Sequence, residues 1–250
     1  MNLTTVVDPS SSALVSQVVE KTVQSITHSW LTGKDSHIVL TGGRTGTQIA
    51  QMLDIELFRA VSSNESLSSQ VVLVLHIWFS DERYTDLSDP DRTDTKLIAE
   101  FSKVQGSNIS IEFHRVSSPA QAPLGAGADE YAHDLDMSLG ERRFDVVLLS
   151  MGEDGHVASL FPGLSTTAHS TKSAVAVDNS PKPPAERVSI SVDRLAAAAA
   201  IFVFALGEGK REALANFLTH KSGPLALVQE AERVGQMIIA TDLVDMSGEK

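Results

Sequence analysis

A histidine flanked by glycines has the clearest capacity for acid–base chemistry in this chain. His156 follows Glu153 and Asp154, and Gly152 and Gly155 flank these two carboxylates. Imidazole exchanges protons near neutral pH, so His156 is predicted to act as a general base. A neighbouring carboxylate such as Asp154 would orient the ring or stabilise its protonated form, as carboxylates do in hydrolytic sites. His156 and Asp154 are therefore the predicted catalytic pair.

The stretch 41–46 has the composition of an anion-binding loop. It reads TGGRTG and joins a predicted strand to a predicted helix. Glycines allow backbone amides to approach an anion, and the start of a helix adds partial positive charge. Gly42, Gly43, Arg44 and Thr45 are thus predicted to bind phosphate. Taken alone, the loop is equally compatible with a tight turn that binds nothing.

Several cations in other loops are candidates to complete the same anion site. Arg83 ends the tripeptide DER after a long apolar run, and guanidinium groups bind phosphate through paired hydrogen bonds. Lys182 lies between prolines, which lower the entropic cost of presenting its side chain. Arg187 follows five residues later, and Lys210 opens a predicted helix. Taken alone, the segments around Arg83 and Lys182 are more typical of solvated surface turns.

The remaining candidates for chemistry are weaker. Six further histidines are predicted to be surface residues without a chemical role: His28, His76, His114, His133, His169 and His220. The chain has no cysteine, which excludes disulfides, thiolate nucleophiles and cysteine-bound metals. It also lacks the Gly-x-Ser-x-Gly motif of many serine hydrolases.

The elements that must position these residues alternate between apolar strands and amphipathic helices. Such alternation indicates an α/β fold of three layers, a mostly parallel sheet with helices on both faces, as in a modified Rossmann fold. Strands are predicted at 37–41, 71–80, 144–149, 174–177, 188–192, 201–206 and 236–240, and an extended segment at 108–116. Helices are predicted at 8–33, 47–60, 93–103, 128–139 and 208–218. In such sheets, ligands bind beyond the carboxyl ends of the strands, and the loops 41–46, 81–83 and 150–156 follow three of these ends. The alanine run 196–200 is predicted to be a helical packing face.

Bulk composition narrows the class of protein. The chain has 250 residues, which suits a single domain spanning 1–250, and 42% of its residues are hydrophobic. Its formal net charge of −12 disfavours nucleic-acid and anionic-membrane partners. No secretory signal and no apolar run of membrane-spanning length are visible. We therefore expect a cytoplasmic protein, either a monomer or a small homo-oligomer.

Taken together, these segments resemble the 6-phosphogluconolactonase family. The resemblance runs from about residue 39 to 210 and is most specific in the segment FDVVLLSMGEDGHVASLFPG. The other segments are TGGRTG at 41–46, FSDERY at 79–84, DPDRTD at 89–94, SPKPPAERVSIS at 180–191 and LGEGKREAL at 206–214. The chain departs from the family pattern at four positions. In the family a serine is common near Arg44 and a proline near Gly46. Asparagine is usual at the position of Thr93, and glycine is common at that of Ser150.

The resemblance implies an enzyme of carbohydrate metabolism. The expected reaction is hydrolysis of 6-phospho-D-glucono-1,5-lactone to 6-phosphogluconate in the oxidative pentose phosphate pathway. His156 would be the general base on water, and no metal or organic cofactor is expected to take part.

Two alternatives remain open. Glucosamine-6-phosphate deaminases are similar in fold, but in them the histidine motif leads into Phe-Asn-Glu-Pro, whereas this chain continues with Ala158–Gly163. A non-catalytic sugar-phosphate sensor would keep the phosphate loop without needing His156, although such sensors usually carry a DNA-binding segment that is not visible here.

Overall fold

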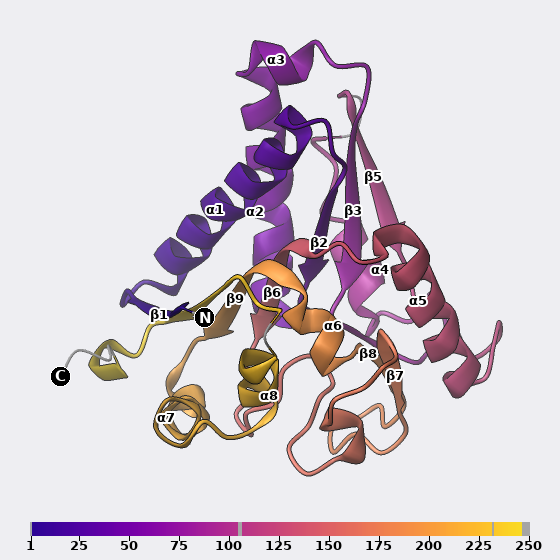
Figure 1. Cartoon of the computed structure of the whole chain (residues 1–250), viewed down its shortest axis with the longest axis vertical. Coiled ribbons are helices and arrows are strands. Elements are labelled where there is room, and N and C mark those ends of the chain that lie inside the picture. Colours follow the sequence, from indigo (N-terminus) through magenta and orange to yellow (C-terminus); the bar gives the residue numbers. More distant parts are fainter. Residues whose placement is uncertain (1, 105–106, 232, 247–250) are drawn as a thin grey trace.

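Seven parallel strands form the central sheet of the computed structural model, which describes residues 2–104, 107–231 and 233–246 (Figure 1). In spatial order the strands are β1 (Asn2–Val7), β10 (Gln236–Thr241), β9 (Ala198–Ala205), β6 (Phe144–Ser150), β2 (Ser36–Leu40), β3 (Leu73–Phe79) and β5 (Ile109–His114). All neighbouring pairs run parallel. The prediction of a mostly parallel sheet is confirmed.

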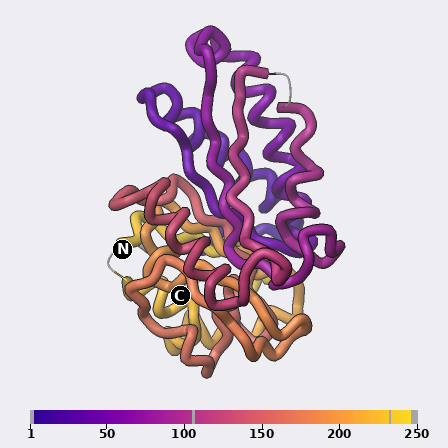
Figure 2. Tube along the Cα trace, turned by 90° about the vertical axis from the view of Figure 1, so that its right-hand side faces the viewer, coloured from indigo at the N-terminus to yellow at the C-terminus, as the bar shows by residue number. Residues whose placement is uncertain are grey.

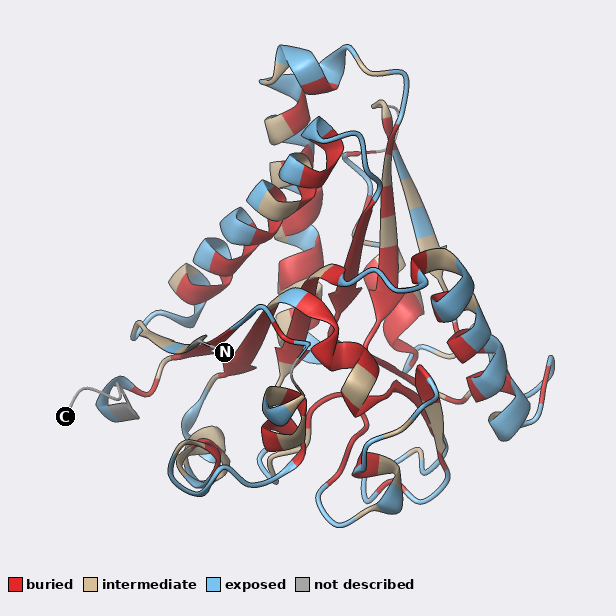
Figure 3. Ribbon diagram, viewed as in Figure 1, coloured by how far each residue is buried: buried red, intermediate tan, exposed pale blue. Residues whose placement is uncertain are grey.

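Helices cover both faces of this sheet. Helices α1 (Ser11–Leu31) and α2 (Gly43–Ser62) pack together on one face, where their apolar residues join one hydrophobic core. The second core unites the opposite face with α5 (Leu124–Leu139), α6 (Val192–Ala196), α7 (Arg211–His220) and α8 (Pro224–Glu230). Figure 3 shows that α1 buries the stripe that faces the sheet and exposes the outer one. The predicted three-layer architecture is thus confirmed.

Short elements complete the chain. The small helices are α3 (Glu65–Ser68) and α4 (Thr93–Ile98), and 3-10 turns cover Ser165–Thr167, Glu208–Lys210 and Val244–Met246. The first half of the chain forms most of one end of the molecule and the second half most of the other (Figure 2). None of the described helices is long and apolar enough to cross a membrane.

A second, antiparallel sheet lies beside the strand ends. It consists of β4 (Asp81–Arg83), β8 (Arg187–Ile190) and β7 (Ala174–Val177), in that order. The prediction of a loop at 81–83 was therefore wrong, because these residues pair with a strand about a hundred positions later. The pairing brings Arg83 opposite Arg187.

The alanine run 196–200 also differs from its prediction. Ala196 ends α6, but Ala198–Ala205 forms β9 between β6 and β10. Alanine favours helix intrinsically, and here the parallel pairing of β9 with both neighbours overrides that preference.

Candidate active site

A cavity of about 180 Å³ lies at the carboxyl ends of the three adjacent strands β6, β2 and β3. Since these strands are neighbours in the sheet, the segments that follow them meet, as the sequence predicted, although the segment after β3 is strand β4 and not a loop. The cavity is lined by Thr41, Gly42, Gly43, Asp81, Arg83, Thr93, Ser150, Met151, Gly152, His156, Ala158, Lys182, Arg187 and Lys210.

His156 and Asp154 form a hydrogen-bonded pair after the end of β6. Asp154 Oδ1 lies 2.5 Å from His156 Nδ1, and the ring rests on Phe161 with 4.6 Å between ring centroids. A carboxylate at this distance holds the proton on Nδ1, which leaves the lone pair of Nε2 free. The side chain of His156 is 16% exposed, so it remains accessible from the cavity. The pair has the arrangement that a general base needs.

Gly152 makes this arrangement possible. A Cβ atom at position 152 would lie 2.0 Å from His156 Nδ1 and 2.5 Å from Asp154 Oδ1. The turn is closed by the amide of Gly152, which donates to the carbonyl of His156 at 2.7 Å. The glycine is therefore required for the imidazole to fold back against the strand end.

The surroundings keep His156 neutral near neutral pH. Burial is the largest influence on the pKa of His156 and lowers it. The hydrogen bond and charge of Asp154 raise this pKa, whereas the charge of Lys182 lowers it. The net effect is a pKa below the ordinary value for histidine. Burial also opposes ionisation of Asp154, but the hydrogen bond from His156 and the charges of His156 and Lys182 lower its pKa on balance. A neutral imidazole beside an ionised carboxylate is the state in which His156 accepts a proton.

Lys182 lies against this pair. Its Nζ is 3.4 Å from His156 Nδ1 and 3.5 Å from Asp154 Oδ1. The sequence placed Lys182 in the anion site but gave no sign of this contact, which joins segments 26 residues apart. The ammonium group is thus close to the place where the reaction would occur.

Arg187 holds the loop that carries Lys182. Its guanidinium donates to the carbonyls of Lys182, Pro183 and Pro184 at 3.1–3.2 Å. The side chain is 6% exposed and lies 3.7 Å from a carboxylate oxygen of Asp81. Arg187 therefore lines the cavity and also fixes the shape of its wall.

Arg83 stands at another part of the cavity wall. Its Nη1 donates to the carbonyl of Asp91 at 2.5 Å. Its Nε is buried and has no hydrogen-bond partner among the described residues. A guanidinium with an unused donor is available to an anionic ligand.

The glycine loop lies close to Thr93. A Cβ atom at Gly42 would come within 2.9 Å of the Thr93 hydroxyl, so the absence of a side chain permits this approach. Gly42 is the N-cap of α2 and has no side-chain cap, and the amides that follow it open a helix of 20 residues. The first turn of such a helix is suited to an anion.

Arg44 and Thr45 differ from the rest of the predicted set. Both belong to the first turn of α2, but neither is among the residues that line the cavity, and Arg44 is exposed. The sequence could not show that Arg44 would be exposed and away from the cavity lining. Their assignment to phosphate stays a prediction.

Two acidic residues near the cavity were not predicted as part of the site. Asp81 lines it and accepts hydrogen bonds from Ser159 Oγ at 2.6 Å and Ser80 Oγ at 3.0 Å. Glu82 is fully buried and accepts from the amides of Arg83, Thr93 and Asp94 at 2.7–2.8 Å. The position of both immediately after a buried strand was the available signal.

The sequence of this chain matches a known protein family over most of its length. The family model for glucosamine-6-phosphate isomerases/6-phosphogluconolactonase matches residues 9–238. The chain belongs to this family.

Individual relatives support the assignment to the glucosamine-6-phosphate isomerase/6-phosphogluconolactonase family. The 6-phosphogluconolactonase of Streptomyces coelicolor is 31% identical over 194 residues, which cover 73% of this chain and 70% of that protein. The 6-phosphogluconolactonase of Mycobacterium tuberculosis is 27% identical over 222 residues, covering 83% and 82%. The structure of 6-phosphogluconolactonase from Trypanosoma cruzi superposes on this chain with a TM-score of 0.81 at 20% sequence identity. The superposition covers 100% of this chain and 98% of that one, so the two share a fold.

Proposed function

We propose that this protein hydrolyses 6-phospho-D-glucono-1,5-lactone to 6-phosphogluconate. The observation that carries the proposal is the His156–Asp154 pair, which opens onto a cavity lined by four cations. Those cations are Arg83, Lys182, Arg187 and Lys210. In a chain with a net charge of −12, such a local excess of positive charge is expected where an anionic substrate binds.

The reaction needs one base and a place for developing negative charge. Nε2 of His156 removes a proton from water, and the water oxygen attacks the lactone carbonyl carbon. The bond between that carbon and the ring oxygen then breaks, and the proton passes from His156 to the ring oxygen. The product is an open-chain carboxylic acid, which releases a proton at neutral pH. Asp154 stabilises the imidazolium that forms between the two proton transfers.

The cations divide between the two ends of the substrate. Arg83 and the amides at Gly42 and Gly43 are assigned to the phosphate, with Arg187 beside them. Lys182 was predicted from the sequence to bind phosphate, and that assignment stays a prediction. Its contact with the His156–Asp154 pair supports a second role, stabilisation of the carbonyl oxygen as that atom becomes negative.

The deaminase alternative asks for more acid–base groups than the cavity offers. Expulsion of ammonia from an amino sugar requires ring opening and proton movement between two carbons. No carboxylate occurs from Val157 to His169. Asp81 does line the cavity, but both of its oxygens accept hydrogen bonds from serine hydroxyls. These observations favour lactone hydrolysis, which needs one base.

The deciding experiment compares the two reactions in one preparation. Purified protein is given freshly generated 6-phosphogluconolactone, and acid release is followed above the spontaneous rate. The same protein is given glucosamine-6-phosphate, and ammonia is measured. We expect rapid acid release and no ammonia, whereas ammonia production at a comparable rate would overturn the proposal. The cytoplasmic location and the monomeric or small homo-oligomeric state stay predictions.

A further inference from the structure

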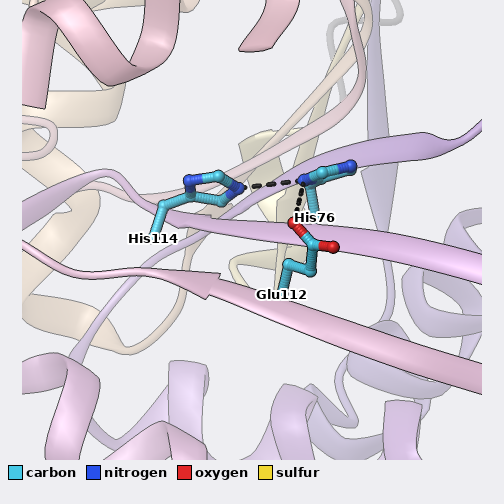
Figure 4. Close-up of side chains that lie close together, drawn as sticks. All are labelled: His76, Glu112 and His114. Atoms are coloured by element: carbon cyan, nitrogen blue, oxygen red, sulfur yellow. Dashed lines mark hydrogen bonds and ion pairs between the residues drawn. The ribbon is translucent and has the colours of Figure 1, made fainter.

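Three side chains outside the active-site cavity converge on one point (Figure 4). His76 lies on β3, and Glu112 and His114 lie on the neighbouring β5. In the parallel register His76 is opposite Glu112, and Trp78 is opposite His114. Residues two apart on a strand share a face, so all of these side chains project from the same face of the sheet.

The spacing of the donor atoms suits a divalent metal ion. His76 Nδ1 lies 2.9 Å from His114 Nε2 and 3.5 Å from Glu112 Oε2. Two ligands in a tetrahedral zinc site, each bound at about 2.0–2.2 Å, lie about 3.3 Å apart. The three donor atoms are all within 4.8 Å of one another, so small side-chain rotations bring them around one ion.

A carboxylate behind His114 fixes its orientation. Asp134, on α5, lies with Oδ2 2.7 Å from His114 Nδ1. The carboxylate holds the proton on Nδ1, which leaves a lone pair on the Nε2 that faces His76. Histidines that bind metals are oriented in this way by an outer carboxylate or carbonyl.

Aromatic stacking holds both imidazole rings in place. The His114 ring lies on Trp78 with 3.6 Å between centroids and an angle of 8°, and the His76 ring lies on His37 with 4.1 Å and 2°. The Glu112 side chain is 55% exposed, which leaves an approach from solvent.

We propose that His76, Glu112 and His114 bind a divalent transition-metal ion of the zinc type. Two imidazoles and one carboxylate are ligands typical of zinc, and water from the exposed side would complete the coordination. Without metal, His76 Nδ1–H donates to His114 Nε2, and on binding that proton transfers through solvent to His76 Nε2. The site would connect β5, one of the two edge strands of the main sheet, to β3.

The proposed ion is separate from the proposed hydrolysis. None of its three ligands is among the residues that line the active-site cavity. Its function would be to stabilise the folded state, because a ligand that binds only the folded protein raises the temperature of unfolding.

The test is a zinc titration of the full-length protein after its metals have been removed with a chelator. Bound zinc is measured against a competing chromophoric chelator, and the midpoint of thermal unfolding is recorded with and without zinc. We expect zinc to raise the midpoint of the wild type. Glu112→Gln and His114→Gln should abolish that rise and the binding, and Asp134→Asn should weaken the affinity by about 10–100-fold, the range for lost outer-shell partners.

Two controls locate the ion. His133→Gln changes an exposed histidine on the same helix as Asp134 and should bind zinc as the wild type does. His156→Ala removes the histidine of the active-site cavity and should also retain the zinc-dependent rise. Glu112→Gln, at a largely exposed side chain, keeps the test valid if His114→Gln does not fold. Zinc binding that survives both Glu112→Gln and His114→Gln, binding lost in His156→Ala, or no binding at micromolar zinc would overturn the proposal.

Discussion

The protonation of His156 depends on burial and on two charged neighbours, which act in different directions. Burial favours the neutral ring, Asp154 favours the protonated ring, and Lys182 favours the neutral ring again. The net result is a lowered pKa, so the base remains neutral to a more acidic pH than a free histidine does. Because hydrolysis needs the neutral ring, turnover should fall as the pH drops through this pKa.

Replacing the two charged neighbours should move that acid limb in opposite directions. Asp154→Asn removes the group that raises the His156 pKa, so the limb should move to lower pH. Lys182→Met removes a group that lowers the pKa, so the limb should move to higher pH. The measurement is kcat/KM for the phosphorylated lactone between about pH 5 and 8, with spontaneous hydrolysis subtracted. Shifts in the same direction would show that the acid limb does not belong to His156.

Arg83 offers a test of phosphate recognition. Arg83→Ala should raise KM for the phosphorylated lactone by about 10–100-fold, because a hydrogen bond to a charged group contributes roughly 1.5–3 kcal/mol. KM for unphosphorylated gluconolactone should hardly change. Arg59→Ala is a matched control, since Arg59 pairs with Glu56 on the exposed side of α2. An equal rise in KM for both lactones would mean that Arg83 does not bind the phosphate.

At the scale of elements, the site depends on how loops are fixed to one another. Arg187 lies on β8, opposite Arg83 of β4 in the antiparallel register. Its guanidinium donates to three carbonyls of the loop that carries Lys182. One buried guanidinium thus connects the small antiparallel sheet to the cavity wall. The position of Lys182 should depend on it.

The dependence can be measured with a double-mutant cycle. Arg187→Met removes three partly buried hydrogen bonds to carbonyls and the charge beside Asp81, so the free energy of unfolding should fall by about 1–3 kcal/mol. If Arg187 positions Lys182, the loss of kcat/KM on Lys182→Ala should be much smaller in the Arg187→Met background than in the wild type. Additive effects on kcat/KM would show that the two residues act independently.

The sequence was sufficient for features determined over short distances. The His156 turn was predictable because Gly152, Asp154 and the histidine lie within five positions, and the strand before it is apolar. The pairing of β4 with β8 could not be predicted, because the two strands are far apart in the chain. The place of Arg44 relative to the cavity depends on the exact start of α2, which glycines at 42 and 43 leave undefined in the sequence.

At the scale of the whole molecule, strand order determines which residues meet. The sequence located six of the seven strands of the main sheet but not their order, and the adjacency of β6, β2 and β3 brings the predicted loops to one cavity. The same order places β3 beside β5 and so joins His76 to His114, two residues predicted to be unremarkable surface histidines. The predicted surface location was wrong, because the side chains are only 13% and 11% exposed.

The net charge also acts on the scale of the molecule. A formal charge of −12 repels an anionic substrate at long range, and the four cations of the cavity counteract it locally. Their grouping at the end of the sheet where β2, β3 and β6 stop therefore explains how an acidic protein would bind a sugar phosphate.

The most direct test of the account is the turnover of His156→Ala on freshly generated 6-phosphogluconolactone. Removal of a general base should lower kcat by about 10²–10⁴-fold, while 6-phosphogluconate should still bind with nearly wild-type affinity. His169→Ala is the matched control, because His169 also pairs with an aspartate, Asp193 at 2.8 Å, but lies outside the residues that line the cavity. The account predicts a large loss of kcat in His156→Ala alone, and near-normal turnover in that variant would contradict it.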